Sequence, residues 1–165
     1  MDQSFMSLSI APLDLHEIGA ALLCGAILGF ERQLKGKPAG IRTSTLICLG
    51  TYVFVKIGFS IHYDPTGAAR TIGQVITGIG FLGAGVILAR EGMVLGVTSA
   101  AVIWLLAALG VTIGSGYPVT AIVVTVLAII ILIGVDLLER WFKELRRGVH
   151  SQLSKRQHNR SSGSE

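Results

Sequence analysis

Acidic and basic residues occur side by side at the ends of long apolar segments of this sequence. Glu31 and Arg32 follow the first such segment, and Arg90 and Glu91 follow the third. Ionisable side chains at these depths in a bilayer are costly to bury, so they tend to be paired or functional. For these two pairs, a structural ion pair and a functional polar site are equally consistent with the sequence.

The sequence carries no pattern typical of an enzyme or of a metal centre. Its His, Cys and carboxylate residues do not have the spacing of zinc ligands, and neither a Ser-His-Asp arrangement nor a phosphate-binding loop is present. Cys24 and Cys48 both lie inside apolar segments, where they are expected to be small buried residues. We therefore expect a protein that is not an enzyme and has no cofactor, while a metal site stays unknown.

The elements that would position these residues are membrane-spanning helices. Of the 165 residues, 51% are hydrophobic and only 15% are charged, and the mean hydropathy is +0.66. A soluble domain of this size could not cover so much apolar surface with so few charges. There is room for one compact bundle, and the N-terminus lacks the basic region of a cleavable signal peptide.

A bilayer core needs about 20 apolar residues for each helix that crosses it. Five segments of the sequence meet or approach that length, and the fifth is the most hydrophobic and is expected to face lipid. They predict an all-α, polytopic membrane protein with a bundle of five transmembrane helices, at Leu15–Phe30, Thr43–Ile61, Ile72–Ala89, Val97–Ile113 and Val119–Leu138.

Basic residues in the connections predict the orientation of these spans. Twelve Lys and Arg fall on one side and one falls on the other, and the richer side is expected to be cytoplasmic, with the N-terminus outside. Residues 1–14 would then be periplasmic, residues 15–138 would form the membrane domain and residues 139–165 would be a basic cytoplasmic tail. We expect this tail to begin as an amphipathic extension of the fifth helix and to be disordered after His150. The asymmetry accounts for the basic composition without a nucleic-acid partner.

Glycines are concentrated in the third span, in the segment GIGFLGAG. At about 100° per residue, Gly78 and Gly85 fall on one face of a helix, and Gly80 and Gly83 fall on the opposite face. Small residues let helix backbones approach closely, so we expect this helix, which also carries Gln74, to lie between two others and to be the most buried. A broken helix that lines an ion site is the alternative, and the absence of proline from this span counts against it.

Two further features concern the other spans. Gly25–Gly29 and Gly110–Gly114 form GxxxG pairs, which are common by chance in Gly-rich helices. Lys56 lies inside the second span, and we expect it to reach outward and to pair with Glu17 or Asp64.

A faint internal repeat relates the first two spans to the next two. GFERQ…GIRTSTLI and ILAREG…GVTSAAVI each close one span near a Glu/Arg dipeptide and open the next after a glycine, Gly40 or Gly96. The two units run in the same direction, so both returning helices would start at the cytoplasmic face with free N–H groups. The alternative to a shared site is a set of separate interfacial anchors. We predict a functional polar site at this face, formed by Glu31, Arg42, Thr43, Glu91 and Thr98.

Three segments, GFERQLKGKPAGIRT, GQVITGIGFLGAGVILAREG and GVTSAAVIWLLAALG, closely resemble signatures of the MgtC/SapB family. The family's ER pair falls on Glu31 and Arg32, its AG-[LI]-RT motif on residues 39–43, its buried Gln on Gln74 and its REG motif on residues 90–92. The resemblance therefore adds Arg32, Gln74 and Arg90 to the candidate polar site.

The resemblance implies a five-span inner-membrane domain linked to magnesium limitation. The chain departs from the MgtC branch in having Thr98-Ser99 where that branch has Asn-Thr, and in having only a short basic tail after the fifth span. Both departures indicate a SapB-like member without the soluble C-terminal domain. We expect a regulator or adaptor that contacts other membrane proteins or further copies of itself, as well as membrane lipids. A transporter or channel for Mg²⁺ or another cation is the alternative.

Overall fold

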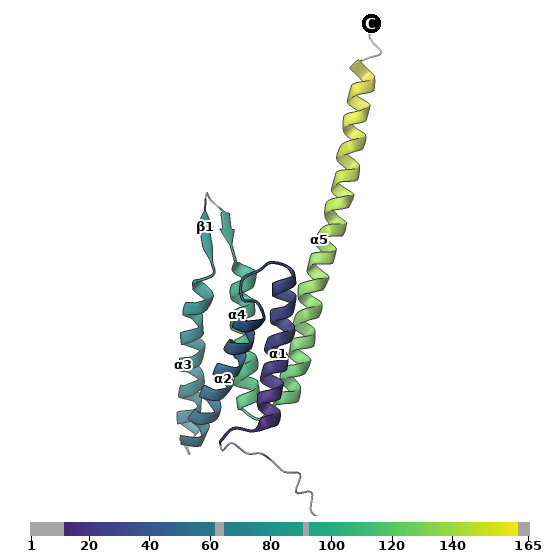
Figure 1. Ribbon diagram of the computed structural model, residues 1–165. Coiled ribbons are helices and arrows are strands. Elements are labelled where there is room, and N and C mark those ends of the chain that lie inside the picture. The colour runs from purple at the N-terminus through teal and green to yellow at the C-terminus, as the bar shows by residue number, and fades with distance from the viewer. Residues whose placement is uncertain (1–11, 62–64, 91–92, 162–165) are drawn as a thin grey trace, which may run out of the picture. The chain divides into compact units, whose positions relative to one another are not determined.

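A computed structural model describes residues 12–61, 65–90 and 93–161 of the chain (Figure 1). The chain divides into two compact units, Met1–Leu127 and Ala128–Glu165. The described elements are α1 (Leu15–Leu34), α2 (Ile41–Ile61), α3 (Pro65–Ala84), β1 (Leu88–Arg90), β2 (Met93–Leu95), α4 (Val97–Gly114) and α5 (Pro118–Ser161).

The helical class is as the sequence predicts, but the third helix is displaced along the chain. It was expected over Ile72–Ala89, whereas α3 begins at Pro65 and ends at Ala84. Proline is favoured in the first turn of a helix because its fixed φ suits that position and its missing N–H is not needed there. After Ala84 the chain forms a short antiparallel hairpin of Leu88–Arg90 and Met93–Leu95, with Leu88 opposite Leu95.

Three of the described helices are long and apolar enough to cross a membrane: α2, α4 and the part of α5 from Pro118 to Leu138. The other two, α1 and α3, have 20 residues each and are therefore long enough, but they are more polar. Glu17, Glu31 and Arg32 lie in α1, for example. The chain thus has the helices of a membrane protein, while five spans and their orientation stay predictions.

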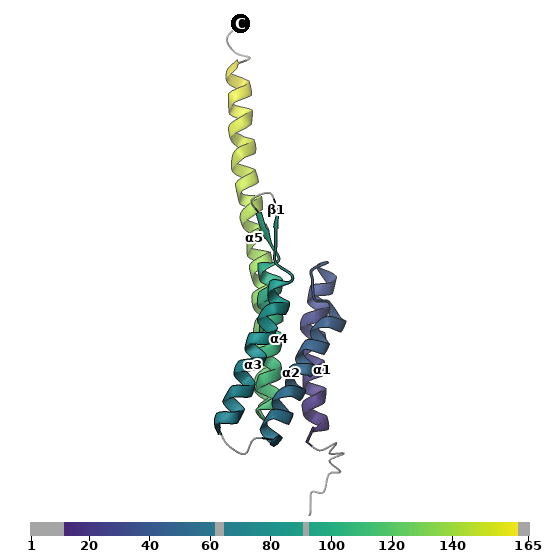
Figure 2. The same cartoon turned by 90° about the vertical axis from the view of Figure 1, so that its left-hand side faces the viewer.

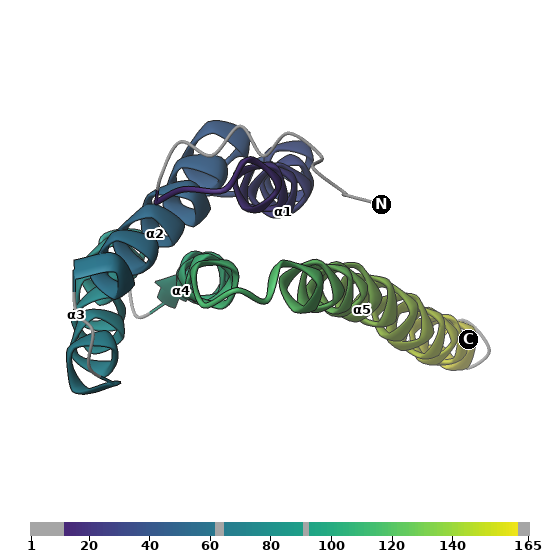
Figure 3. The same ribbon diagram turned by 90° about the horizontal axis from the view of Figure 1, so that it is seen from below.

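The first unit is built around α2, which contacts α1, α3 and α4 (Figure 3). The α1–α2 connection and the β1–β2 hairpin lie at one end of these helices, here called the hairpin end (Figures 1 and 2). α1 and α3 run toward this end, and α2 and α4 run back from it, as the parallel repeat predicts. Gly40 and Gly96 directly precede the two returning helices, and their carbonyls accept from the N–H groups of Ser44 at 3.0 Å and Ala100 at 2.9 Å.

Glycines of α1 and α4 bring these helices into close contact with α2. A Cβ atom placed on Gly25 would lie 2.6 Å from the Thr45 Cα, and one placed on Gly110 would lie 2.6 Å from the Cys48 carbonyl oxygen. Real Cβ atoms do not approach backbone this closely, so larger residues would force the helices apart. The helix that lies between two glycine-bearing neighbours is therefore α2.

α3 has a different environment from the one expected. Gly67, Ile79 and Gly83 are its only buried residues among those described, so the expectation that the third span is the most buried is wrong for the single chain. Gly83 makes an ordinary contact with α4, where its Cβ position lies 3.7 Å from the Ala100 carbonyl oxygen. Gly78 and Gly80 have no described atom within 4 Å of their Cβ positions.

The second unit is the rest of α5. Between Ala128 and Leu138 its exposed side chains are aliphatic, among them Ile130, Ile131 and Ile133, which suits contact with lipid. The helix continues to Ser161, beyond His150, where the sequence had suggested a disordered tail.

Candidate functional site

A buried carboxylate with two basic partners lies at the hairpin end of α1. Glu31 Oε2 accepts from Arg32 Nε at 2.5 Å, and Glu31 Oε1 accepts from Arg32 Nη2 at 2.9 Å. Lys35 Nζ lies 2.6 Å from the same Oε1. Glu31 is 7% exposed and Arg32 is 3% exposed. A charge-assisted, two-pronged pair of this kind is strong, and it also neutralises the two buried charges.

The charges around Glu31 set its ionisation. Burial alone raises the pKa of this carboxyl, but hydrogen bonds and positive charge from Arg32 and Lys35 outweigh burial and hold the pKa below its usual value. Glu31 therefore stays ionised at neutral pH. It acts as a fixed negative group inside a positively charged surrounding, which is the arrangement of a structural or binding anchor.

The start of α2 lies close to this end of α1. A Cβ atom on Gly29 would lie 2.6 Å from the Ile41 Cα. The Ile41 backbone N–H donates to Gln33 Oε1 at 3.3 Å, and the buried Ser44 hydroxyl donates to the Ala39 carbonyl at 2.7 Å. These bonds give the connection between the helices a defined shape at the edge of the ion pair.

The other predicted polar residues form no ion pair or hydrogen bond with Glu31 among the described residues. Arg42, Thr43 and Thr98 are exposed, and the ion-pair partners of Glu31 are Arg32 and Lys35 rather than Arg42. Arg90 lies in β1, with only its backbone described, and Glu91 lies outside the described residues. A shared cluster of Glu31, Arg42, Thr43, Glu91 and Thr98 therefore stays a prediction.

Residues that the sequence did not single out complete this end of the molecule. Lys35 stands four residues after Glu31, the spacing at which helical ion pairs form, and this signal could have identified it. The buried hydroxyls after the two matching glycines belong to Ser44 and Ser99, not to the neighbouring Thr43 and Thr98. A pattern of hydroxyls at a helix start does not tell which of them turns inward.

A second charged group lies at the opposite end of the same two helices. Lys56 Nζ lies 2.7 Å from Glu17 Oε2 and 3.1 Å from Asp14 Oδ2, which confirms the predicted pairing with Glu17. Asp64 lies outside the described residues. The Asp14 backbone N–H also donates to the Tyr52 hydroxyl at 3.1 Å. One ammonium thus holds two carboxylates and fixes the start of α1 against α2.

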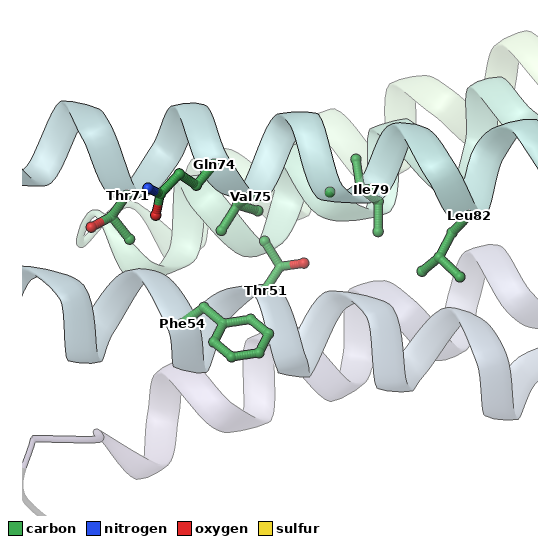
Figure 4. A pocket seen from close by; sticks show the side chains of 8 residues that line it. Thr51, Phe54, Thr71, Gln74, Val75, Ile79 and Leu82 are labelled. Carbon is green, nitrogen blue, oxygen red and sulfur yellow. The ribbon is translucent and has the colours of Figure 1, made fainter.

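A groove of about 390 Å³ lies between α2 and α3 (Figure 4). Thr51 and Phe54 line it from α2, and the predicted site residue Gln74 lines it from α3. The remaining lining residues are Thr71, Val75, Gly78, Ile79 and Leu82. None of these residues is charged, so the groove offers neutral oxygens on an apolar wall.

Within the described residues, no group of three or more His, Cys, Asp or Glu side chains is placed to hold a metal ion. The polar side chains of the groove are the amide of Gln74 and the hydroxyls of Thr51 and Thr71. Mg²⁺ prefers octahedral oxygen coordination that includes carboxylates and waters. A neutral groove fits a hydrated ion less well than a site with carboxylates would.

Comparisons with known proteins give a consistent result. A model of the MgtC family matches residues 18–141. The chain is 42% identical over 142 residues to YhiD of Escherichia coli, which is named provisionally as a magnesium transporter; the match covers 82% of this chain and 65% of YhiD. SrpB of Synechococcus elongatus is 39% identical over 139 residues, with 75% of this chain and 76% of SrpB covered.

MgtC of Brucella abortus is 40% identical over 112 residues, and the match covers 68% of this chain and 47% of that protein. The chain thus spans about two thirds of the length of YhiD and about half of the length of MgtC. No solved structure matches the chain at a significant level.

Proposed function

Because the chain belongs to the MgtC family, we propose that it is an inner-membrane protein that serves adaptation to low magnesium as a regulator or adaptor of other membrane proteins. In this proposal the chain spans the membrane five times, with its N-terminus outside and its C-terminus in the cytoplasm. The positive charge of the α1–α2 connection and of the end of the chain supports this orientation.

The arrangement of charges in the described helices is the observation that supports the regulatory role. Glu31 is neutralised by Arg32 and Lys35 at the hairpin end, and Lys56 is held by Glu17 and Asp14 at the other. The groove between these ends has no charged lining residue. A path for a divalent cation needs favourable oxygen ligands along its length, and ion pairs that satisfy each other inside the chain do not supply them.

A transporter or channel for Mg²⁺ is the second candidate, and the groove is the observation that favours it. Thr51, Thr71 and Gln74 bring neutral oxygens together between α2 and α3, and carbonyl and hydroxyl oxygens can replace part of a hydration shell. The name of the E. coli relative points in the same direction.

Ion flux separates the two proposals. The purified chain would be reconstituted alone into liposomes that contain a fluorescent Mg²⁺ indicator, and Mg²⁺ would be added outside. A regulator is expected to give the same slow leak as empty liposomes. Uptake that saturates with Mg²⁺ and falls in Gln74→Leu would overturn the regulatory role. Restoration of growth at low Mg²⁺ in a strain that lacks the protein, without such uptake, would support it.

A further inference from the structure

One face of α3 combines a polar, a small and an aromatic residue that do not pack against the rest of the described chain. Gln74, Gly78 and Phe81 are four and three residues apart, so they lie along one stripe of the helix. The Phe81 side chain is 83% exposed. Gly78 has no described atom within 4 Å of its Cβ position, and Gln74 is exposed without a hydrogen-bond partner among the described residues.

Lipid is a poor neighbour for this face. Gln74 is the tenth of the 20 residues of α3, so its amide lies near mid-depth if the helix crosses the membrane. An amide that cannot form hydrogen bonds in hydrocarbon is strongly disfavoured, and membrane helices satisfy such groups by contact with other helices. The exposed aliphatic residues of α5, such as Ile130 and Ile131, show what a lipid-facing stretch of this chain contains.

The face is complementary to itself. Phe81 projects from α3 beside the groove whose wall includes Gly78 and Leu82 of the same helix, so a projecting ring and a hollow lie at similar depths. The amide of Gln74 both donates and accepts hydrogen bonds, so two such amides can pair with each other. Copies of one membrane protein share one orientation, and a two-fold axis along the membrane normal brings equal depths together.

We propose that α3 is the contact surface between two copies of this chain. In this dimer, Phe81 of each copy packs over Gly78 and into the α2–α3 groove of the second copy, and the two Gln74 amides hydrogen-bond to each other. Gly78 is small because the second copy's ring occupies the space above it. This inference rests on the proposed five-span topology, in which α3 crosses the membrane, but not on the proposed role in magnesium adaptation.

Oxidative cross-linking of the full chain in bacterial membranes tests the position of the contact. Gln74→Cys and Phe81→Cys place thiols next to the two-fold axis, and both are expected to give disulfide-linked dimers. Leu23→Cys in α1, at a residue that is 49% exposed, is the matched control. The wild-type chain gives the background, because Cys24 and Cys48 are buried. Cross-linking at both α3 positions that is no greater than at Leu23→Cys would overturn the proposal.

Dilution in lipid measures how strongly two copies associate, and it tests whether a second copy covers the α3 face. The purified, fluorescently labelled chain would be reconstituted at decreasing protein-to-lipid ratios, and dimers would be counted by single-molecule photobleaching. Phe81→Ala and Gly78→Leu are expected to weaken association about tenfold, because the first removes the ring and the second fills the space that the ring would occupy. Phe30→Ala in α1, at a residue that is 55% exposed, is expected to leave association unchanged. Circular dichroism melting of Gly78→Leu checks that the monomer is folded.

Two results contradict the dimer. One is a wild-type chain that is monomeric at every lipid ratio, which would assign the face to lipid or to a different protein. The other is a dimer that is equally strong in Phe81→Ala, Gly78→Leu and the wild-type chain, which would place the contact elsewhere.

Discussion

Two sets of glycines in the first unit have opposite surroundings. Gly25, Gly29, Gly110 and Gly114 of α1 and α4 face α2, and a Cβ atom at any of them would come within 2.6 to 2.8 Å of an α2 atom. Gly78 and Gly80 of α3 have open space at the same position within the described chain. The first set makes one chain compact, whereas the second leaves room for something outside it.

The comparison shows that glycine content does not by itself indicate how a membrane helix packs. Glycine permits close approach, but the approach happens only where a neighbouring helix presents a suitable surface. α2 supplies that surface to α1 and α4 through Thr45, Cys48 and Val55. Substitutions of glycine should therefore have effects that follow the local clearance rather than the residue type.

The largest effect is expected for Gly110→Leu. The new side chain would start 2.6 Å from the Cys48 carbonyl oxygen and 2.9 Å from the Tyr52 nitrogen, and these backbone atoms can move only if α4 separates from α2. We expect a loss of more than about 3 kcal/mol in the free energy of unfolding. Thermal unfolding in detergent measures this. Ala101→Leu, at an exposed residue of the same helix, is the control, and equal melting temperatures would show that α2 and α4 are not in tight contact.

The next largest effect is expected for Glu31→Gln, which tests whether the buried ion pair at the end of α1 stabilises the chain. Loss of the carboxylate leaves the guanidinium of Arg32, which is 3% exposed, without its partner. Breaking a buried pair in this way costs about 3 kcal/mol. A double-mutant cycle with Lys35→Met should show coupling, while a cycle with Arg42→Gln should be additive. Strong coupling to Arg42 instead would support the shared polar cluster that the sequence suggests.

Glu31 also gives a prediction for pH. Its pKa is lowered in the folded chain, so its contribution to stability is fully present above the unfolded pKa. That contribution is lost as the pH falls through the lower, folded pKa. The wild-type chain should therefore lose stability on acidification below about pH 4, and Glu31→Gln should lose less over the same range. Parallel pH profiles for the two proteins would count against an ionised, paired Glu31.

Sequence patterns predicted those parts of the fold that depend on local composition. The lengths of the apolar segments identified the five helices. The repeated glycines, Gly40 and Gly96, correctly marked the positions directly before α2 and α4. The pairing of Lys56 with Glu17 followed from the cost of an isolated charge in an apolar segment. The hairpin was missed because short apolar segments such as its strands, Leu88–Arg90 and Met93–Leu95, are equally compatible with a helix and a strand.

The sequence was less informative about the neighbours of each helix. The GIGFLGAG segment has more glycines than either GxxxG pair, yet the described chain packs its helices closely at Gly25 and Gly110 and leaves Gly78 open. The sequence analysis also did not single out Lys35, which lies one helical turn after Glu31 and pairs with it. Both findings have the same physical cause. A helix has several faces, and one sequence does not say which of them meets another helix.

An intermediate effect is expected for Gly83→Leu, which probes the contact between α3 and α4. The Cβ position lies 3.7 Å from the Ala100 carbonyl oxygen, so a methyl group fits but a longer side chain must displace its neighbours. We expect a loss of about 1–2 kcal/mol, typical of moderate overpacking. Ile130→Leu, at a residue that is 59% exposed, should lose almost nothing. If both variants melt alike, α3 does not pack against α4 at this point.

The smallest effect is expected for Gly78→Ala, and it is the most direct test of the contrast between the two sets of glycines. No described atom lies within 4 Å of the new methyl group, so the monomer has no clash to relieve. Alanine is favoured over glycine in a helix by about 1 kcal/mol, and the variant should unfold at the same temperature as the wild-type chain or slightly above it. Gly114→Ala, whose methyl group would lie 2.8 Å from Val55 Cγ1, should unfold at a lower temperature. Both proteins would be measured at a large excess of detergent that separates the copies, as checked by size-exclusion chromatography, so that a contact between copies does not contribute. A clear loss of stability in Gly78→Ala under these conditions would mean that α3 packs inside the chain after all. Its glycines would then have the same role as those that face α2.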